Sequence, residues 1–285
     1  MVPMIPRLAL PTLFVLAALL PPAAAALPAD GCRPAGEVRV DAVDSGGILV
    51  LADGSRAALA GIEVPRRPLA LSDAEAWPAA ERATAALTAL VAASPLGLYR
   101  CGAEDRYGRQ MVDAVTADGR WLRNELLRQG WARVTPSADS RIGAAQLLAV
   151  EAGARDMRRG IWAMPAYALR RPAESWRYVD SLQVVEGVVT KARLARGELV
   201  LGFGDNPRRG LTLRLAKPLL ARLAAYPPLA AYAGNPLALA GARLRVRGWI
   251  GKAMGPVIEV SQLEQIEPAI QNVNRRRWAR RAEER

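Results

Sequence analysis

The stretch 48-ILVLADGSRAALAGIEVP-65 contains two apolar runs that flank a tight turn, and it determines how the first part of the chain folds. Its Asp53-Gly54 dipeptide is typical of a hairpin turn between two strands. A second turn, Ser45-Gly46-Gly47, precedes the first run and connects it to another strand-like stretch. The strands predicted in this antiparallel meander cover residues 37–43, 48–51 and 56–62.

The residues after the meander predict an alternation of helices and strands. Alanine, leucine and charged residues recur at helical spacing over residues 79–92, and Ser94-Pro95 ends that helix. The later elements are strands at 98–101 and 111–116 and helices at 122–129 and 144–159. The order is therefore three strands, a helix, two strands and two helices.

Five short strings in this region resemble landmarks of the staphylococcal (thermonuclease-type) nuclease family, and they occur in that family's order. The strings are Leu51-Ala52-Asp53-Gly54, Leu59-Ala60-Gly61-Ile62-Glu63-Val64-Pro65, Asp105-Arg106-Tyr107-Gly108-Arg109, Leu126-Leu127-Arg128-Gln129-Gly130 and Gly160-Ile161-Trp162. The resemblance covers roughly residues 37–162. It implies an α+β fold in which an OB-type β-barrel carries helices.

The resemblance also assigns roles to five positions of this chain. In these nucleases two aspartates bind a calcium ion, a glutamate helps to activate the attacking water, and two arginines neutralise the phosphate. The aspartate of the first turn falls on Gly47, and the second aspartate falls on Glu63. The first arginine falls on Ala58, whereas the second is present as Arg109. The general-base glutamate falls on Arg66, which reverses the charge.

These substitutions predict that nuclease activity by the family's mechanism is absent or very weak. Glu63 and Arg109 remain as remnants of the catalytic set, and no cofactor is expected. In an alternative alignment, the chain is a Ca²⁺-dependent phosphodiesterase whose missing ligand comes from Asp41, Asp44 or Asp53. Arg109 also has an alternative role as a brace of the barrel. The resemblance therefore leaves open whether the chain is an enzyme.

The first 26 residues have the order of a secretory signal peptide. Arg7 precedes the apolar run 8–20, and Pro21-Pro22 leads into the alanines at 23–26. The apolar run is shorter than the roughly 20 residues that a membrane-spanning helix needs. We therefore expect cleavage near residue 25 or 26, no transmembrane segment in the mature chain, and a periplasmic or secreted location. A retained membrane anchor is the alternative.

The chain has two cysteines and no histidine. In an oxidising compartment Cys32 and Cys101 are expected to form one disulfide, with unpaired thiols as the alternative. The absence of histidine excludes Ser-His-Asp triads, Cys-His pairs and His-ligated zinc. The formal net charge of +12 favours polyanionic partners such as nucleic acid, although a GC-rich genome also produces an arginine-rich composition.

A linker at residues 165–180 separates the nuclease-like domain, residues 36–164, from a second strand-rich domain at 181–268. Five strands with a helix between the third and the fourth predict a second, OB-like barrel. The strands lie at 184–190, 199–203, 211–215, 243–249 and 257–260, and the helical stretch covers 218–232. A basic C-terminal tail follows at residues 269–285.

One strand of this second barrel carries a candidate binding stripe. Arg243, Arg245 and Arg247 alternate along the strand, which puts them on one face, and Trp249 continues that face. OB barrels bind single strands through a basic groove and stacking aromatic side chains. The alternative is a solvated outer face.

Three functions agree with these observations. The first is a catalytically degenerate nuclease-like module that binds nucleic acid, another polyanion or a partner protein. Its candidate contact residues are Arg66, Arg67, Arg109, Arg245, Arg247 and Trp249. The second is a metal-dependent (Ca²⁺) phosphodiesterase with relocated ligands. The third is a structural envelope protein that uses its barrels for protein contacts.

Overall fold

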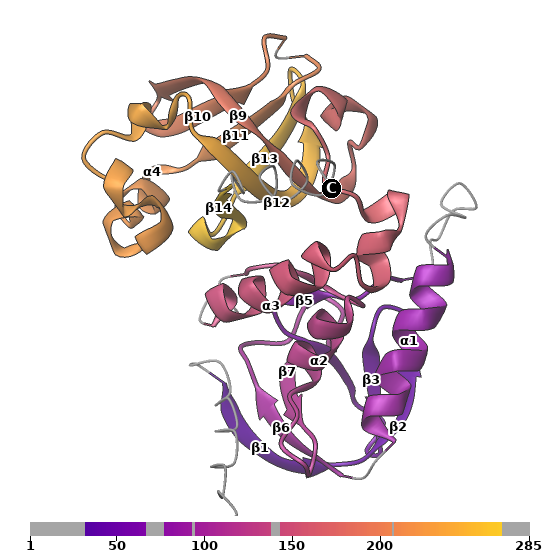
Figure 1. Cartoon of the computed structure of the whole chain (residues 1–285). Coiled ribbons are helices and arrows are strands. Elements are labelled where there is room, and N and C mark those ends of the chain that lie inside the picture. The colour runs from indigo at the N-terminus through magenta and orange to yellow at the C-terminus, as the bar shows by residue number, and fades with distance from the viewer. Residues whose placement is uncertain (1–31, 67–76, 93–94, 138–142, 207, 270–285) are drawn as a thin grey trace, which may run out of the picture.

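The computed structural model describes residues 32–66, 77–92, 95–137, 143–206 and 208–269 (Figure 1). They form two β-barrels that follow one another along the chain. The predicted signal peptide, Arg67 and residues 270–285 of the basic tail lie outside the described residues. No helix in the described part of the chain has both the length and the apolar character that crossing a membrane requires.

The first barrel is a six-stranded sheet in the order β1-β6-β7-β4-β3-β2. Its strands are β1 (Arg33–Val38), β2 (Val40–Asp44), β3 (Ile48–Leu51), β4 (Arg56–Leu59), β6 (Leu96–Arg100) and β7 (Gln110–Val115). β1 and β2 are two legs of one bent strand that is interrupted at Arg39. Because β1 pairs with β6 and β2 pairs with β3, this bent strand closes the sheet. β4 and β7 pair in parallel, which gives the five-stranded Greek-key arrangement of an OB-type barrel.

A disulfide holds the seam between β1 and β6. It joins Cys32, directly before β1, to Cys101, directly after β6. These are the two cysteines whose pairing the sequence favours. The bond closes a loop with a sequence separation of 69 residues. The N-terminal leg of the closing strand is therefore fixed covalently to its neighbour.

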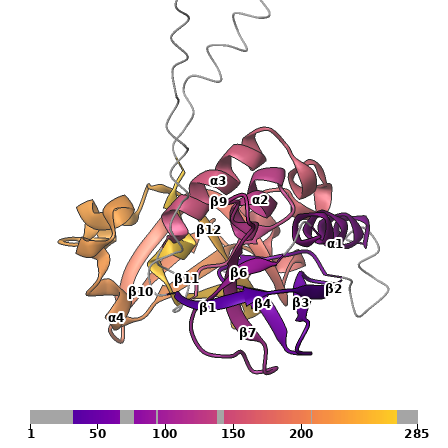
Figure 2. The ribbon, with the colours of Figure 1, turned by 90° about the horizontal axis from the view of Figure 1, so that it is seen from below.

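Three helices lie together on one side of the first barrel, as the view from below shows (Figure 2). They are α1 (Trp77–Val91), α2 (Leu122–Gln129) and α3 (Ala144–Asp156). Leu122, Leu126 and Leu127 of α2 are fully buried and pack into the barrel core. α2 ends at Gly130, whose φ of 78° suits glycine and whose Cβ, if present, would lie 2.3 Å from the Arg159 carbonyl oxygen.

A short two-stranded sheet lies beside the barrel. β5 (Ile62–Glu63) pairs antiparallel with β8 (Arg133–Val134), and Glu63 is the register partner of Arg133. Neither β8 nor this pairing was predicted, because a two-residue strand carries no periodic signal. The pairing brings together residues that are 70 positions apart in the sequence.

A second barrel follows in the region for which the sequence predicts an OB-like barrel. Its strands are β9 (Ser181–Ala195), β10 (Glu198–Phe203), β11 (Leu211–Leu215), β12 (Arg243–Lys252), β13 (Pro256–Val260) and β14 (Ile266–Pro268). The sheet runs β13-β11-β10-β9-β12-β14, and the additional β12–β13 pairing closes it into a five-stranded ring. β11 and β13 pair in parallel, so the two barrels share one strand order.

The expectation of one helix over residues 218–232 is wrong. This region contains one turn of α-helix, α4 (Lys217–Leu220), followed by the 3₁₀ segments η5 (Leu223–Ala225), η6 (Pro227–Tyr232) and η7 (Pro236–Leu239). Pro227 and Pro228 lack backbone N–H groups, so a regular helix cannot continue through them. Leucines of these short segments are still buried in the second barrel's core.

The segment between the barrels is ordered against the second barrel. It contains η2 (Gly160–Ala163), η3 (Pro165–Tyr167) and η4 (Pro172–Arg177). The Arg170 backbone N–H donates to the carbonyl of Val184 in β9 at 2.9 Å. Val184 also packs in an apolar cluster with Ile161 and Trp162. The two barrels therefore share a packed contact.

Candidate functional site

A cavity of about 330 Å³ opens at the mouth of the first barrel. Its lining includes all five positions that the resemblance singles out: Gly47, Ala58, Glu63, Arg66 and Arg109. They come from the β2–β3 turn, from β4, from β5 and the residues after it, and from the loop before β7. The five positions that the resemblance singles out therefore lie together around one cavity.

Gly47 has no room for a side chain. Its φ is +72°, and a Cβ on it would lie 2.6 Å from Cγ2 of Val64. A Cβ on the neighbouring Gly46 would lie 3.2 Å from Cβ of Arg66. The turn is therefore packed against residues 64–66, and a carboxylate cannot be accommodated at position 47 without a backbone shift.

The carboxylate of Glu63 is bound by an arginine. Arg133 donates to Glu63 Oε2 from Nε at 3.0 Å and from Nη2 at 2.5 Å. The Glu63 side chain is 27% exposed and the Arg133 side chain 9%. Arg133 Nη1 also donates to the carbonyl of Leu182 in the second barrel at 3.1 Å. Sequence reasoning missed Arg133 because the β5–β8 pairing that positions it was not foreseen.

Arg109 has an acidic partner of its own. It donates to Asp105 Oδ2 from Nε at 2.7 Å, and its backbone N–H donates to Oδ1 at 3.1 Å. Burial disfavours the charged form of Asp105, but the hydrogen bonds from Arg109 and from the Tyr107 backbone hold its pKa below the ordinary value. The Arg109 guanidinium also lies 5.0 Å from the centre of the Tyr107 ring. Asp105 lies within one of the landmark strings, but the resemblance assigns it no site role.

Arg66 is exposed at the rim of the cavity, and no ion pair joins it to another residue in the described part of the chain. The cavity region thus contains three arginines, Arg66, Arg109 and Arg133, and two carboxylates, Glu63 and Asp105. Both carboxylates are engaged by arginines, whereas Arg66 is not engaged. The net charge of these five side chains is therefore +1.

The carboxylates proposed as replacement ligands do not line this cavity. Asp44 pairs with Arg56, and Asp53 accepts the backbone N–H of Ser55 at 2.8 Å. Nowhere in the described ranges do three or more His, Cys, Asp or Glu side chains gather as a metal site. Calcium requires several oxygen ligands, so this donor set does not fit the family's ion.

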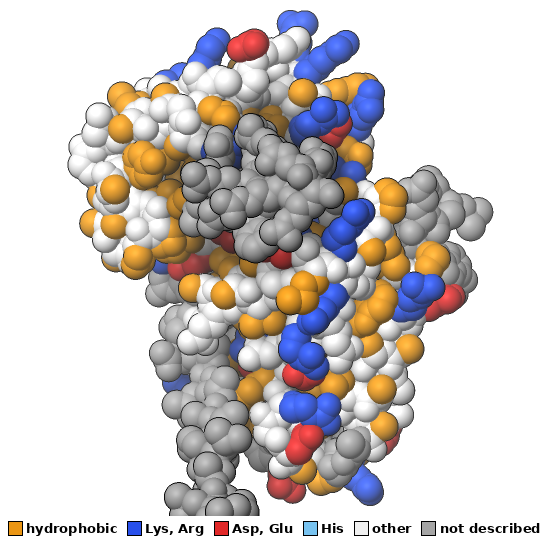
Figure 3. All heavy atoms as spheres, viewed as in Figure 1, with side chains coloured by type: hydrophobic (Ala, Val, Ile, Leu, Met, Phe, Trp, Pro, Cys, Tyr) orange, Lys and Arg blue, Asp and Glu red, His pale blue; other side chains and the backbone are white. Residues whose placement is uncertain are grey.

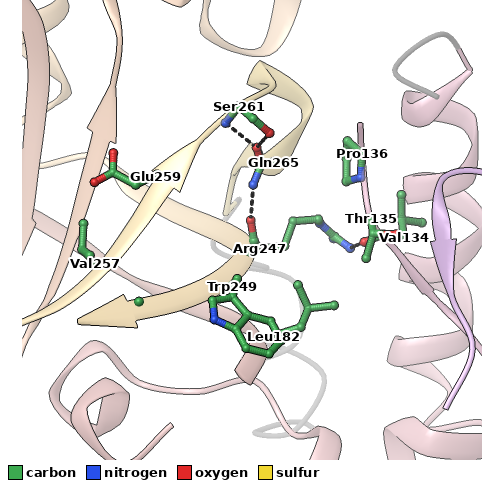
Figure 4. Close-up of a pocket in the computed structure, with 12 residues that line it drawn as sticks. Val134, Thr135, Pro136, Leu182, Arg247, Trp249, Val257, Glu259, Ser261 and Gln265 are labelled. Atoms are coloured by element: carbon green, nitrogen blue, oxygen red, sulfur yellow. Dashed lines mark hydrogen bonds between the residues drawn. The ribbon is translucent and has the colours of Figure 1, made fainter. Parts of the chain in front are cut away.

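The second barrel forms one wall of the cavity. Leu182 of β9 and Trp249 of β12 line it together with Thr135, which follows β8. The same three residues line a second cavity of about 360 Å³ between the barrels (Figure 4). In that view Arg247 extends from β12 toward Val134 and Thr135 of the first barrel.

The predicted stripe on β12 faces the first barrel. Arg247 is 2% exposed and donates to Glu151 of α3 from Nη1 at 2.8 Å and from Nη2 at 3.0 Å. Arg245 pairs with Glu186 of β9 at 2.8 Å. Trp249 is 54% exposed. Arg247 is therefore buried in the barrel–barrel contact and does not lie on an open strand face.

Glu151 is the centre of this buried contact. It is fully buried and accepts hydrogen bonds from the Val134 backbone at 2.6 Å and from Arg155 at 2.7 Å, in addition to those from Arg247. Burial disfavours its charge, but the attraction of Arg247 and these hydrogen bonds hold the pKa of Glu151 below the ordinary value. Glu267 adds a second acceptor for Arg247 at 2.5 Å.

Positive charge on the face shown in Figure 3 is spread over both barrels. Lysine and arginine side chains are scattered from one end to the other, and several lie beside acidic side chains. This face does not present one continuous basic patch. Net charge alone therefore does not locate a polyanion site here.

Residues 56–164 match the family model of staphylococcal nuclease homologues, which is under half of the chain. The matched part contains Glu63, Arg66 and Arg109 and ends at residue 164, directly after η2. No curated protein matches this sequence. Residues 56–164, which include β4 to β8 and the helices of the first barrel, are thus similar to staphylococcal nuclease homologues.

Proposed function

We propose that this chain is an exported protein whose nuclease-like barrel has lost phosphodiester cleavage and binds single-stranded nucleic acid at the cavity. The observation that carries the proposal is the pairing of both cavity carboxylates with arginines, Glu63 with Arg133 and Asp105 with Arg109. Each carboxylate thus has a guanidinium as its counter-charge, in the place where the family's mechanism needs a metal ion.

Cleavage needs a base and a set of oxygen ligands, and the cavity supplies neither. Position 66 carries a guanidinium, which cannot deprotonate water at physiological pH. Position 47 carries no side chain. Glu63 Oε2 already accepts two N–H groups from Arg133. The family's Ca²⁺-dependent mechanism therefore lacks its ligand set and its base in this chain.

Anion binding needs only accessible positive charge, and the cavity presents such charge. Arg66 is exposed and unpaired among the described residues, and Arg109 keeps part of its guanidinium accessible. Guanidinium groups bind phosphate through paired N–H donors. The overall charge of +12 favours approach of a polyanion from solution.

The test uses the purified mature protein and an Arg109→Ala variant with labelled single-stranded DNA and RNA. We expect no cleavage with calcium or with a chelator, and binding that falls steeply as salt rises from low to physiological concentration. Binding that does not depend on salt would contradict a polyanion site. Calcium-dependent cleavage that disappears in Arg109→Ala would instead identify a working phosphodiesterase with relocated ligands.

A further inference from the structure

Trp249 lies at the point where the two cavities meet. It lines both of them, as do Leu182 and Thr135. The two cavities are therefore adjacent parts of one groove, which runs from Arg66 and Arg109 on the first barrel into the space between the barrels. Each part has the size of a small-molecule site.

The second-barrel wall of this groove is a flat apolar platform. Trp249 of β12 and Leu182 of β9 are register partners, so their side chains stand next to each other on the sheet (Figure 4). The indole is 54% exposed. A large aromatic side chain of this exposure between two domains offers a face for a planar ring.

Arg247 lines the groove, and one of its donors is unpartnered. Nη1 donates to the Val134 carbonyl and to Glu151, and Nη2 donates to Glu151 and Glu267. These bonds use four of the five guanidinium N–H groups. Nε is buried and has no hydrogen-bond partner, although Arg247 lines the cavity between the barrels. A buried donor without a partner is costly, but Nε has almost no accessible surface, so it contributes no contact to the groove as it stands.

We propose that the groove binds one nucleotide unit of a single strand, with its phosphate at Arg66 and Arg109 and its base stacked on Trp249. This inference rests on the proposed function and adds that the second barrel makes the base contact. The binding site is therefore composite, and neither barrel contains all of it.

The chemistry of the groove favours a nucleotide over simpler ligands. A polyanion without rings leaves Trp249 and Leu182 in water, and an apolar ligand leaves Arg66 without a counter-charge. A nucleotide presents both an anion and a planar ring. It therefore matches the cationic end and the aromatic platform together.

The test compares two fluorescein-labelled probes in anisotropy titrations, a decamer of thymidine and an abasic decamer with the same phosphates. The protein variants are Trp249→Ala, Trp249→Phe and the control Trp176→Ala. Trp176 is also an exposed tryptophan of the second half of the chain but lines neither cavity. All are measured on the full mature chain.

We expect Trp249→Ala to weaken binding of the thymidine decamer about 10- to 100-fold, the size of one base–aromatic stacking contact. The abasic decamer should bind wild type and Trp249→Ala equally, and Trp249→Phe should retain most of the affinity for the thymidine decamer. Trp176→Ala should bind as wild type does.

Three results would overturn the inference. Equal affinity of wild type and Trp249→Ala for the thymidine decamer would refute stacking and leave the proposed function intact. An equal loss on both probes would show that Trp249 acts on the fold and not on the base. If neither probe binds the wild type, the proposed function fails as well.

Discussion

Arg247→Met tests whether the two barrels are held together by a buried ion pair. The change removes both N–H contacts to Glu151, which is fully buried, and leaves that carboxylate with the Val134 N–H and Arg155. Removing one partner of a buried ion pair costs about 3–5 kcal/mol because an undercompensated charge stays in the interior. We expect the free energy of unfolding to fall by that amount at pH 7, measured by urea denaturation.

The matched control is Arg214→Met. Arg214 also contacts two carboxylates, Glu198 at 2.5 Å and Glu259 at 3.2 Å, but its side chain is 42% exposed. Exposed ion pairs of this kind contribute about 0–1 kcal/mol. The two variants lose the same side chain and the same number of acidic partners, so the difference between them reports burial together with the bond from Arg247 to the Val134 carbonyl.

The effect of Arg247→Met should depend on pH. The folded-state pKa of Glu151 is lowered, so its stabilising contribution is present above its ordinary pKa of 4.5 and is lost as the pH falls below it. In the variant the main attraction that lowers this pKa is gone, and burial raises it. Glu151 then becomes protonated at a higher pH, which relieves the unpaired charge. The gap between wild type and variant should therefore shrink from pH 7 to pH 4.

Two outcomes would refute this reasoning. A loss no larger than that of Arg214→Met would mean that water reaches Arg247 and that the barrels do not enclose it. A gap that stays constant with pH would mean that Glu151 is not the group left uncompensated.

Three further predictions concern the first barrel. Gly47→Asp should lower the free energy of unfolding by about 1–3 kcal/mol, because residue 47 has a positive φ and its Cβ would contact Val64. The variant should not gain calcium-dependent cleavage. A variant that calcium stabilises and that is active would show that the turn can rearrange. Replacing both Cys32 and Cys101 by serine should lower the free energy of unfolding by about 4 kcal/mol, measured by urea denaturation, because the bond closes a loop with a sequence separation of 69 residues. An unchanged urea midpoint would show that the β1–β6 pairing alone holds the seam. Asp105→Asn should tighten binding of the thymidine decamer, because a carboxylate that competes for Arg109 is removed, whereas weaker binding would show that Asp105 mainly positions Arg109.

The sequence predicts the barrels well where a local signal exists. The continuous apolar run of β3 and the leucines of α2 define their own boundaries, and both elements lie at the predicted residues. The turn glycines likewise mark the meander correctly. These features depend on residues close in sequence, which periodicity and turn chemistry report.

The pairing of charges could not be predicted in the same way. Arg133 reaches Glu63 through two two-residue strands, and Arg247 reaches Glu151 across 96 residues. No local pattern records such contacts. An alternating row of arginines on a strand has the same sequence pattern whether its face meets water or another domain. The pattern therefore does not predict the burial of Arg247.

The bent strand formed by β1 and β2 makes barrel closure depend on a short N-terminal leg. If this leg detached from β6, the backbone N–H and C=O groups of Leu96–Arg100 would become an open sheet edge. Such an edge can accept a strand from a neighbouring molecule. The Cys32–Cys101 bond therefore protects the protein against strand exchange and self-association, in addition to stabilising the monomer, and a chain kept in a reducing environment lacks that protection.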